Sequence, residues 1–162
     1  MLFKNRLTKE QALEKIKHYC NYQERCHSEV KDKLYSYGLR KNEVDEIVSQ
    51  LIESNFLNEE RFAVQFAGGK FRMKQWGRKK IQYELQQKNI NSFIIKIALK
   101  EIDEEKYLET LLKLAQTKWK ALKVENTLVR QSKTNAYLLQ KGYEQRLITE
   151  VINEIKNGAR EQ

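Results

Sequence analysis

The chain has 162 residues, of which 40% are hydrophobic and 33% are charged, and its formal net charge is +9. This apolar content is enough for one ordinary domain or for three small units that share a core. No apolar run approaches the roughly 18 residues that a membrane-spanning helix needs, so we expect no membrane partner. An excess of positive charge of this size predicts attraction to polyanions.

The N-terminal segment 1–7 shows neither the apolar stretch nor the small-residue cleavage site of a secretory signal. The chain contains two cysteines, which is too few for a disulfide framework. Both features favour the reducing cytoplasm as the compartment.

One pattern occurs three times along the chain, at spacings of about 50 residues. Each copy has a helix that ends at Gly38, Asn89 or Gly142, the residue types that most readily adopt a left-handed backbone. Apolar residues then recur at the same offsets, which trace one face of a helix. They are Val44, Ile47, Val48 and Leu51; Ile95, Ala98, Leu99 and Ile102; and Ile148, Val151, Ile152 and Ile155.

The first unit, residues 1–56, is expected to contain three helices, capped by Thr8, Ser28 and Asn42. The second, 57–102, begins with an Asn58 cap and is interrupted at Gly77, and Asn91 caps its last helix. An apolar stripe of Phe62, Phe66 and Met73 is expected along its first helix.

The third unit, residues 103–162, begins at an Asp103 cap with a long helix and has a weak break at 123–126. A second helix ends at Gly142, and a third runs from Glu144 to about Asn157. The absence of proline and the abundance of Lys, Glu, Gln and Leu favour helix throughout. We therefore predict an all-α fold of three tandem three-helix repeats that form an elongated, curved array.

The middle of the chain is strongly basic, since residues 70–88 contain seven Lys or Arg and one acid, Glu84. Lys and Arg side chains neutralise phosphates and release condensed counterions, and aromatic rings can stack on bases. Trp76 is either such a stacking platform or a packing residue at the Gly77 turn. The candidate nucleic-acid or filament-binding residues are Lys70, Arg72, Lys74, Trp76, Arg78, Lys79 and Lys80.

Four further residues are candidates for contact with a partner: Arg61, Tyr83, Lys118 and Lys120. Tyr83 lies within the basic segment, and the two lysines belong to a second basic run. Arg61 also has a structural interpretation, in which it pairs with a carboxylate across a unit boundary.

The segments 57–63 and 75–90 resemble the central motif of the RecX family, bacterial regulators of the recombinase RecA. That motif has an acidic-Glu-Arg-Phe-Ala stretch, an aromatic-Gly pair, a basic cluster, and Ile and Glu-Leu before a Lys-Gly pair. Here Arg78 stands where the family often has proline, and Asn89 where it usually has glycine. The likeness covers roughly residues 10–157.

The resemblance implies a non-enzymatic protein that binds RecA and its filament on DNA, limits filament extension, and suppresses ATPase and strand exchange. It thereby implies a role in recombination, DNA repair and the SOS response. We expect a monomer without cofactors. The alternative is a sequence-independent protein that binds single- or double-stranded DNA without RecA. A third interpretation is a helical scaffold for protein partners.

Catalytic and metal-binding patterns are weak. His18, Cys20, Cys26 and His27 are potential zinc ligands, but their spacing fits no common zinc module. Gly68-Gly69 is not a phosphate-binding loop. We therefore expect no metal and no enzymatic activity. We also expect reversal of Arg72, Lys74, Arg78 and Lys79 to Glu to abolish inhibition while leaving helicity and the melting temperature nearly unchanged.

Overall fold

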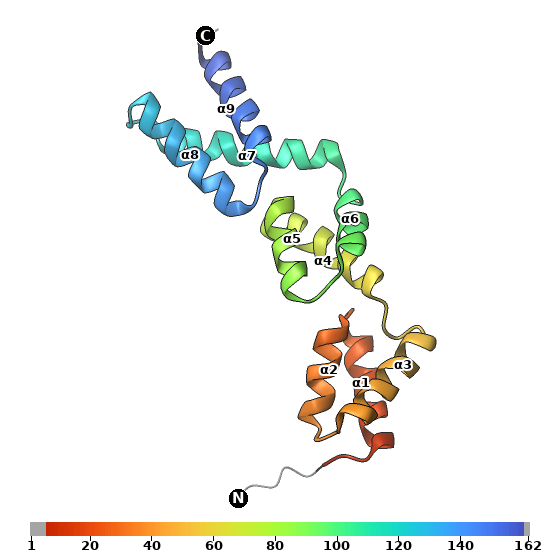
Figure 1. The fold of residues 1–162 in the computed structure, drawn as a ribbon. Helices are drawn as coiled ribbons and strands as arrows, with labels where there is room; N and C mark the ends of the chain where they lie inside the picture. Colours follow the sequence, from red (N-terminus) through yellow and green to blue (C-terminus); the bar gives the residue numbers. More distant parts are fainter. Residues whose placement is uncertain (1–5, 161–162) are drawn as a thin grey trace, which may run out of the picture. The chain divides into compact units, whose positions relative to one another are not determined.

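The computed structural model describes the backbone of residues 6–160 and the side chains of residues 6–158. Within this range the chain forms nine α-helices and no strand (Figure 1). Taken in threes, they are α1 (Lys9–Tyr22), α2 (His27–Ser36) and α3 (Lys41–Glu53); α4 (Glu59–Lys74), α5 (Arg78–Gln87) and α6 (Ser92–Lys100); and α7 (Glu104–Ala121), α8 (Thr127–Lys141) and α9 (Gln145–Arg160). The predicted all-α fold of three-helix units is confirmed.

The first helix of each triplet begins as its sequence predicts, with a polar cap that follows an apolar residue. Side-chain oxygens of Thr8, Asn58 and Asp103 accept hydrogen bonds from backbone N–H groups three residues on, at 3.2, 2.9 and 3.1 Å. These bonds satisfy amides that have no partner within the helix. The start of each triplet is therefore fixed locally.

Two predicted caps are wrong, because a glutamate in the first turn moves the helix start. The cap of α2 is Cys26 rather than Ser28, and Glu29 accepts a hydrogen bond from the Cys26 N–H at 3.1 Å. The cap of α3 is Arg40 rather than Asn42, and the Arg40 N–H donates to a carboxylate in the same way. In both, the glutamate three residues after the cap accepts a hydrogen bond from the cap N–H, which is one of the two bonds of a capping box.

The second helix of each triplet ends in the left-handed conformation that the sequence predicts. The φ angles are 86° at Gly38, 62° at Asn89 and 100° at Gly142. After Asn89 and Gly142, the next N–H bonds back to Leu85 and Leu138 at 3.1 Å, which closes the helix end.

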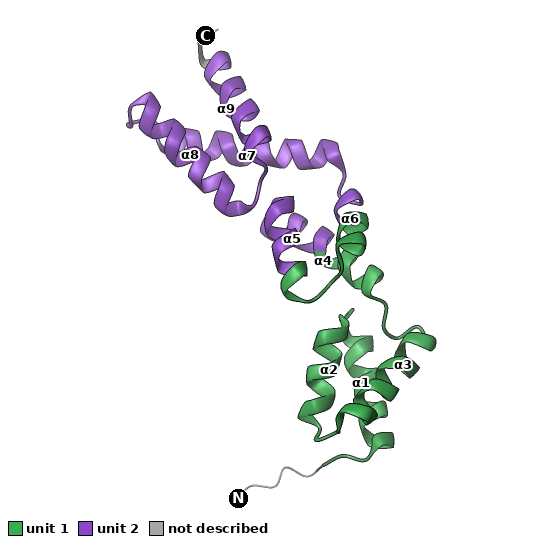
Figure 2. Cartoon of the chain, in the orientation of Figure 1, with its two compact units in different colours: residues 1–66, 85–98 green, residues 67–84, 99–162 purple. Residues whose placement is uncertain are grey.

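The chain divides into two compact units, and the division passes through α4, α5 and α6 (Figure 2). Unit 1 comprises 1–66 and 85–98, and unit 2 comprises 67–84 and 99–162. The middle triplet thus contributes to both units. The repeat boundaries 1–56, 57–102 and 103–162 stay a prediction.

Most buried apolar residues lie on the helix faces that the sequence indicates, but Met73 and Leu108 do not. Ile16, Leu34 and Ile47 are completely buried in unit 1, as are Leu111, Leu138 and Ile148 in unit 2. Met73, expected on the apolar face of α4, is 82% exposed. Phe71 is buried instead, and a residue two positions along a helix points to a nearly opposite side. Within residues 6–160, no helix combines the length and apolarity needed to cross a bilayer.

Candidate nucleic-acid interface

The N-terminus of α5 packs directly against the end of α8 within unit 2. The Gly77 N–H donates to the Lys141 carbonyl at 2.8 Å, and the Lys79 N–H donates to the Gly142 carbonyl at 2.9 Å. A Cβ atom on Gly77 would lie 2.3 Å from the carbonyl carbon and oxygen of Gly142, so only glycine fits. We call this contact the C-terminal joint; it comprises residues 75–79, Tyr107 and residues 141–144.

Three amides at this helix start, those of Gly77, Arg78 and Lys79, are occupied. Besides the two bonds to the end of α8, the Arg78 N–H donates to the Tyr107 hydroxyl at 3.0 Å. Free N–H groups at a helix N-terminus form a ready anion site. Here the first amides are consumed by protein contacts, so a phosphate near α5 would be bound by side chains.

Arg78 is an internal ion-pair residue, which changes its predicted role. Its guanidinium donates to Glu144 at 2.7 Å and to Glu104, and it lies 3.8 Å from the centre of the Tyr107 ring. Its side chain is 21% exposed. Burial acts to lower the pKa of Arg78, but the hydrogen bond and charge of Glu144 outweigh it and raise the pKa. The charge of Arg78 is therefore committed to the fold.

Tyr107 lies at the centre of this joint, and no motif in the sequence singles it out. Its ring is completely buried, 5.7 Å from the Phe71 ring and 5.1 Å from the Tyr143 ring. Its hydroxyl donates to Glu144. Burial, followed by this bond, raises the pKa of Tyr107 far above its usual value, so it stays a neutral donor and acceptor.

Trp76 lies between two lysines from different helices. Lys70 Nζ of α4 is 5.2 Å from the ring centre, and Lys80 Nζ of α5 is 4.6 Å from it. A cation over an indole face is stabilised electrostatically. The half-buried ring therefore already engages the protein's own cations. This arrangement favours the packing interpretation of Trp76 over the stacking one.

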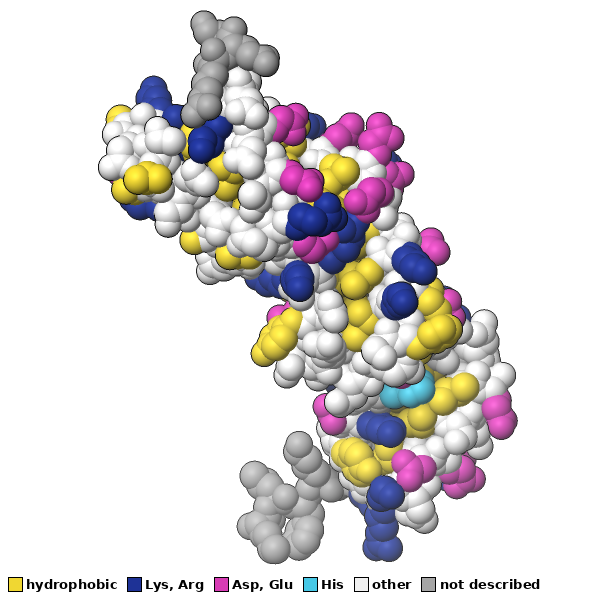
Figure 3. Space-filling model, turned by 45° about the horizontal axis from the view of Figure 1, so that its top comes forward, with side chains coloured by type: hydrophobic (Ala, Val, Ile, Leu, Met, Phe, Trp, Pro, Cys, Tyr) yellow, Lys and Arg dark blue, Asp and Glu magenta, His cyan; other side chains and the backbone are white. Residues whose placement is uncertain are grey.

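Basic side chains are mixed with acidic ones on the face shown in Figure 3, so positive charge does not form one uniform patch there. The basic residues without a carboxylate partner are therefore informative. Among the described side chains, no Asp or Glu pairs with Arg72, Lys74, Lys79 or Lys80. The first three of these are exposed. These four residues, which we call the unpaired basic set, are the members of the predicted set whose charge no carboxylate neutralises.

The other predicted contact residues differ in accessibility. Tyr83 is 58% exposed, and it lies one helical turn after Lys79 on α5. Lys118 Nζ lies 5.0 Å from the centre of the Tyr137 ring. Lys120 is exposed and borders a groove between α7 and α9. Tyr83 and Lys120 are therefore more accessible to solvent than Lys118.

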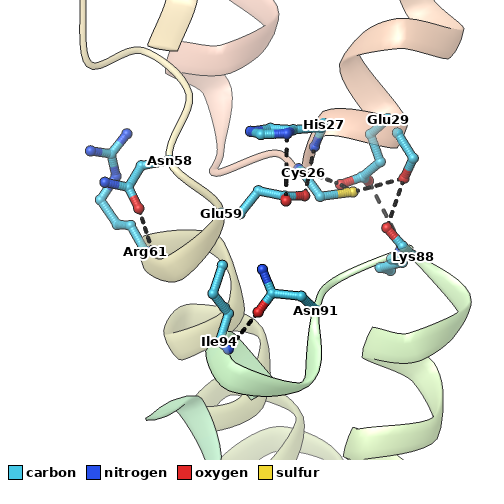
Figure 4. A network of polar contacts seen from close by, with 10 residues as sticks. Cys26, His27, Glu29, Asn58, Glu59, Arg61, Lys88, Asn91 and Ile94 are labelled. Atoms are coloured by element: carbon cyan, nitrogen blue, oxygen red, sulfur yellow. Dashed lines mark hydrogen bonds and ion pairs between the residues drawn. The ribbon is translucent and has the colours of Figure 1, made fainter. Parts of the chain in front are cut away.

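A corresponding contact within unit 1 joins the start of α2 to α4 and to the end of α5 (Figure 4). The His27 N–H donates to Glu59 at 3.2 Å, and the Ser28 hydroxyl donates to the Lys88 carbonyl at 3.1 Å. His27 Nδ1 lies 3.4 Å from the same Glu59 carboxylate. We call this contact the N-terminal joint; it comprises residues 26–29, Glu59 and Lys88.

Arg61 forms an ion pair with Glu24, across the predicted boundary between the first and second repeats. This agrees with the structural interpretation of Arg61. Its Nε donates to Glu24, which precedes α2, and its guanidinium also donates to the Asn55 carbonyl at 3.1 Å. The second Glu24 carboxylate oxygen is buried without a partner. Contact between Arg61 and a partner molecule stays a prediction.

Cys20 and Cys26 are free and buried, and burial raises the pKa of both thiols. Neither is therefore activated as a thiolate. Within the described part of the chain, no group of three or more His, Cys, Asp and Glu side chains is arranged to hold a metal ion.

The fold and this site define a class of protein. It consists of tandem three-helix domains in which the start of a middle helix contacts the following triplet. Two family models match the chain, "RecX, second three-helix domain" over residues 58–99 and "RecX, third three-helix domain" over residues 104–152. Together these matches cover more than half of the chain. The chain therefore belongs to the RecX family.

Similar curated proteins carry the same family name. A regulatory protein RecX from Clostridium botulinum is 34% identical over 131 residues, which are 80% of this chain and 61% of that protein. One from Bacillus cereus is 28% identical over 139 residues, 86% of this chain and 52% of that protein. The chain thus spans between half and two thirds of these relatives' lengths.

Solved structures show the same fold. The crystal structure of RecX from Lactobacillus salivarius matches with a TM-score of 0.84 and 25% identity, over 91% of this chain and 96% of that one. A second crystal structure of regulatory protein RecX matches with a TM-score of 0.81 and 21% identity, over 90% and 71% of the two chains. The latter likeness concerns the fold alone.

Proposed function

We propose that this chain is a non-enzymatic regulator that binds RecA and RecA–DNA filaments. It inhibits filament extension, ATPase activity and strand exchange, and so modulates recombination and DNA repair, including the SOS response. It acts in the cytoplasm, as a monomer. The observation that carries the proposal is that both matched domains, and the curated relatives, belong to a family of regulatory proteins.

The proposed surface for DNA within the filament is the unpaired basic set Arg72, Lys74, Lys79 and Lys80. Four Lys or Arg contacts to phosphates would release about as many counterions, which corresponds to a slope of log affinity against log salt between about −3 and −4. Arg78 is left out of this surface, because a phosphate would have to displace Glu144 and Glu104 from it.

Tyr83 supplies the proposed aromatic contact. It is exposed and follows Lys79 by one turn, so a phosphate and a neighbouring base could meet the two side chains together. Trp76 instead positions Lys70 and Lys80 through its ring.

The second candidate function is DNA binding without RecA, and the unpaired basic set favours it equally. The two are distinguished by adding the protein to RecA that hydrolyses ATP on single-stranded DNA. We expect inhibition at protein concentrations well below that of RecA, because one molecule bound to a filament affects many protomers.

Inhibition that requires enough protein to cover the DNA would favour simple competition for DNA and overturn the filament proposal. Absence of inhibition at any ratio would overturn it as well. A parallel titration of labelled single-stranded DNA without RecA gives the concentration at which the DNA is covered.

A further inference from the structure

Tyrosines and cations alternate along the seam between α1 and α2 of unit 1, two helices that lie side by side (Figure 1). On α1, Lys15, Tyr19 and Tyr22 follow one another at spacings of four and three residues, which places them on one side of the helix. Helix α2 and the residues that flank it supply the other members. We call the whole set the tyrosine–cation strip; it comprises Lys15, Tyr19, Tyr22, Arg25, Lys33 and Tyr37.

Each cation of the strip lies over an aromatic ring. The Arg25 guanidinium is 3.7 Å from the centre of the Tyr19 ring, and Lys33 Nζ is 5.5 Å from the same centre. Lys15 Nζ is 5.9 Å from the centre of the Tyr37 ring. A tyrosine face attracts a cation through its quadrupole, without a net charge that would cancel the cation's own. The rings therefore hold three positive charges along one seam.

These charges are not neutralised by carboxylates. Among the described side chains, no Asp or Glu forms an ion pair with the three cations of the strip. Glu29 is the acid of α2 whose charge acts on Tyr19. Its carboxylate accepts a hydrogen bond from the Cys26 N–H at 3.1 Å and lies 3.9 Å from Lys88 Nζ, so it is engaged elsewhere. Both lysines of the strip are exposed, and such a surface attracts a polyanion.

The third triplet contains the same contact between arginine and ring, which separates its structural part from the rest. Arg25 Nε donates to the Tyr19 carbonyl at 3.1 Å. Arg130 Nε donates to the Trp119 carbonyl at 2.7 Å, and its guanidinium lies 4.2 Å from the centre of the Trp119 ring. The contact thus fastens the seam between the first two helices in both triplets. The first triplet adds Tyr22, which is 83% exposed three residues after Tyr19.

Tyr22 is the open ring of the strip. Its ring centre is 6.0 Å from the Arg25 guanidinium, whereas Lys80 Nζ approaches the centre of the Trp76 ring to 4.6 Å. Cation–π attraction fades at about 6 Å, so Arg25 engages Tyr22 only weakly. A base of a single strand stacks on such a ring while the neighbouring phosphates contact cations. The strip combines both elements.

We propose that the tyrosine–cation strip binds single-stranded DNA, with a base stacked on Tyr22 and the adjoining phosphates at Arg25 and Lys33. Duplex DNA is disfavoured, because its bases are already stacked on one another and do not reach the ring. The choice of DNA over RNA rests on the proposed function, whereas the binding itself requires no RecA. The strip lies outside the unpaired basic set and would be a second contact with the strand.

The test measures binding of a fluorescent oligodeoxythymidylate by anisotropy, without RecA. The full chain carries Arg72→Glu, Lys74→Glu and Lys79→Glu, which reverse three charges of the unpaired basic set. We expect saturable binding to remain. Adding Tyr22→Ala should weaken it by about 5-fold or more, because a stacked base is lost. The dependence of affinity on salt should stay the same, because Tyr22 carries no charge.

A second variant and two controls distinguish stacking from charge. Lys33→Ala removes one phosphate contact, so the slope of log affinity against log salt should become shallower by about 0.7. Lys31→Ala is its control, because a residue two positions along a helix points to a nearly opposite side. Tyr35, four residues after Lys31 and 44% exposed, supplies the control Tyr35→Ala for Tyr22→Ala. Neither control should change affinity or slope, and circular dichroism verifies that all variants remain helical.

The proposal is overturned if no saturable binding remains, or if Tyr22→Ala binds as tightly as Tyr35→Ala. An equal loss on a duplex of the same length would overturn the choice of a single strand. If a polyglutamate peptide displaced the oligonucleotide as well as unlabelled oligonucleotide does, the strip would be a site for acidic protein, which also overturns the proposal. Because RecA is absent and the basic set is charge-reversed, these outcomes are separate from any failure of filament binding.

Discussion

The two joints share one plan but use different chemistry. In both, the start of a middle helix is held by the next triplet's first helix and by the end of its second helix. The N-terminal joint relies on side chains. The Glu59 carboxylate accepts a hydrogen bond from the His27 N–H, and the Ser28 hydroxyl donates one to the Lys88 carbonyl. The C-terminal joint brings two backbones together at Gly77 and Gly142 and surrounds them with buried tyrosines.

The difference indicates how each joint responds to change. A side-chain bond can be lost at the cost of about 1 kcal/mol, while the backbones remain free to adjust. Backbone atoms in direct contact leave no such freedom, because a close-packed interior transmits the displacement. The C-terminal joint should therefore be much less tolerant of substitution.

The largest effect is expected from Gly77→Ala. Its Cβ would lie 2.3 Å from Gly142 backbone atoms, so the joint must separate, and the free energy of unfolding should fall by about 3 kcal/mol. Gly69→Ala is the control, because nothing lies within 4 Å of the added Cβ in the interior of α4. That change should stabilise by roughly 0.5–1 kcal/mol. Urea denaturation of both variants measures the two changes in unfolding free energy. Equal changes would contradict the close approach of Gly77 to the Gly142 backbone.

Arg78→Met should have the next largest effect. It leaves Glu144 without its cation and removes the guanidinium from the Tyr107 ring in a partly buried site, at a cost of about 2 kcal/mol. Arg72→Met, at an exposed and unpaired arginine, should change stability by less than ~0.5 kcal/mol. Thermal denaturation compares the two. An Arg78→Met protein as stable as wild type would mean that the Arg78 charge is available for DNA after all.

Ser28→Ala tests the N-terminal joint. It removes the hydroxyl that bonds to the Lys88 carbonyl at 3.1 Å, so unfolding should become easier by about 1 kcal/mol. Ser36→Ala on the same helix removes an exposed hydroxyl and should have almost no effect. A loss as large as that of Gly77→Ala would contradict the contrast between the joints.

Thr134→Val should raise stability by up to about 1 kcal/mol. The Thr134 hydroxyl is completely buried and has no hydrogen-bond partner, so burying it carries an uncompensated cost. Eight residues before the left-handed position, the other triplets have the apolar Val30 and Ile81. Chemical denaturation measures the gain, and a loss of stability would indicate that the hydroxyl is satisfied in solution.

Local signals made much of the fold predictable. Gly38, Asn89 and Gly142 end helices because their backbone conformation disfavours other residues, and Thr8, Asn58 and Asp103 cap through bonds only three residues long. The caps of α2 and α3 were misplaced because a first-turn glutamate competed with a nearby Ser or Asn.

The candidate site was less predictable because its partners are distant in sequence. Arg78 reaches Glu144 across 66 positions, and no periodicity links the two residues. The same holds for Gly77 and Gly142, whose close approach depends on how two triplets meet. The expectation that reversing a set including Arg78 would leave stability unchanged does not fit this ion pair.

The most direct test of the proposed function measures inhibition of RecA ATPase on single-stranded DNA by two charge-reversed proteins. One carries Arg72→Glu, Lys74→Glu and Lys79→Glu, with Arg78 retained. The other carries Lys31→Glu, Lys96→Glu and Lys100→Glu, which change the net charge equally at exposed positions elsewhere. We expect the first to lose inhibition and the second to inhibit, like wild type, below the RecA concentration. Equal inhibition by both variants, or none by wild type, would contradict the account.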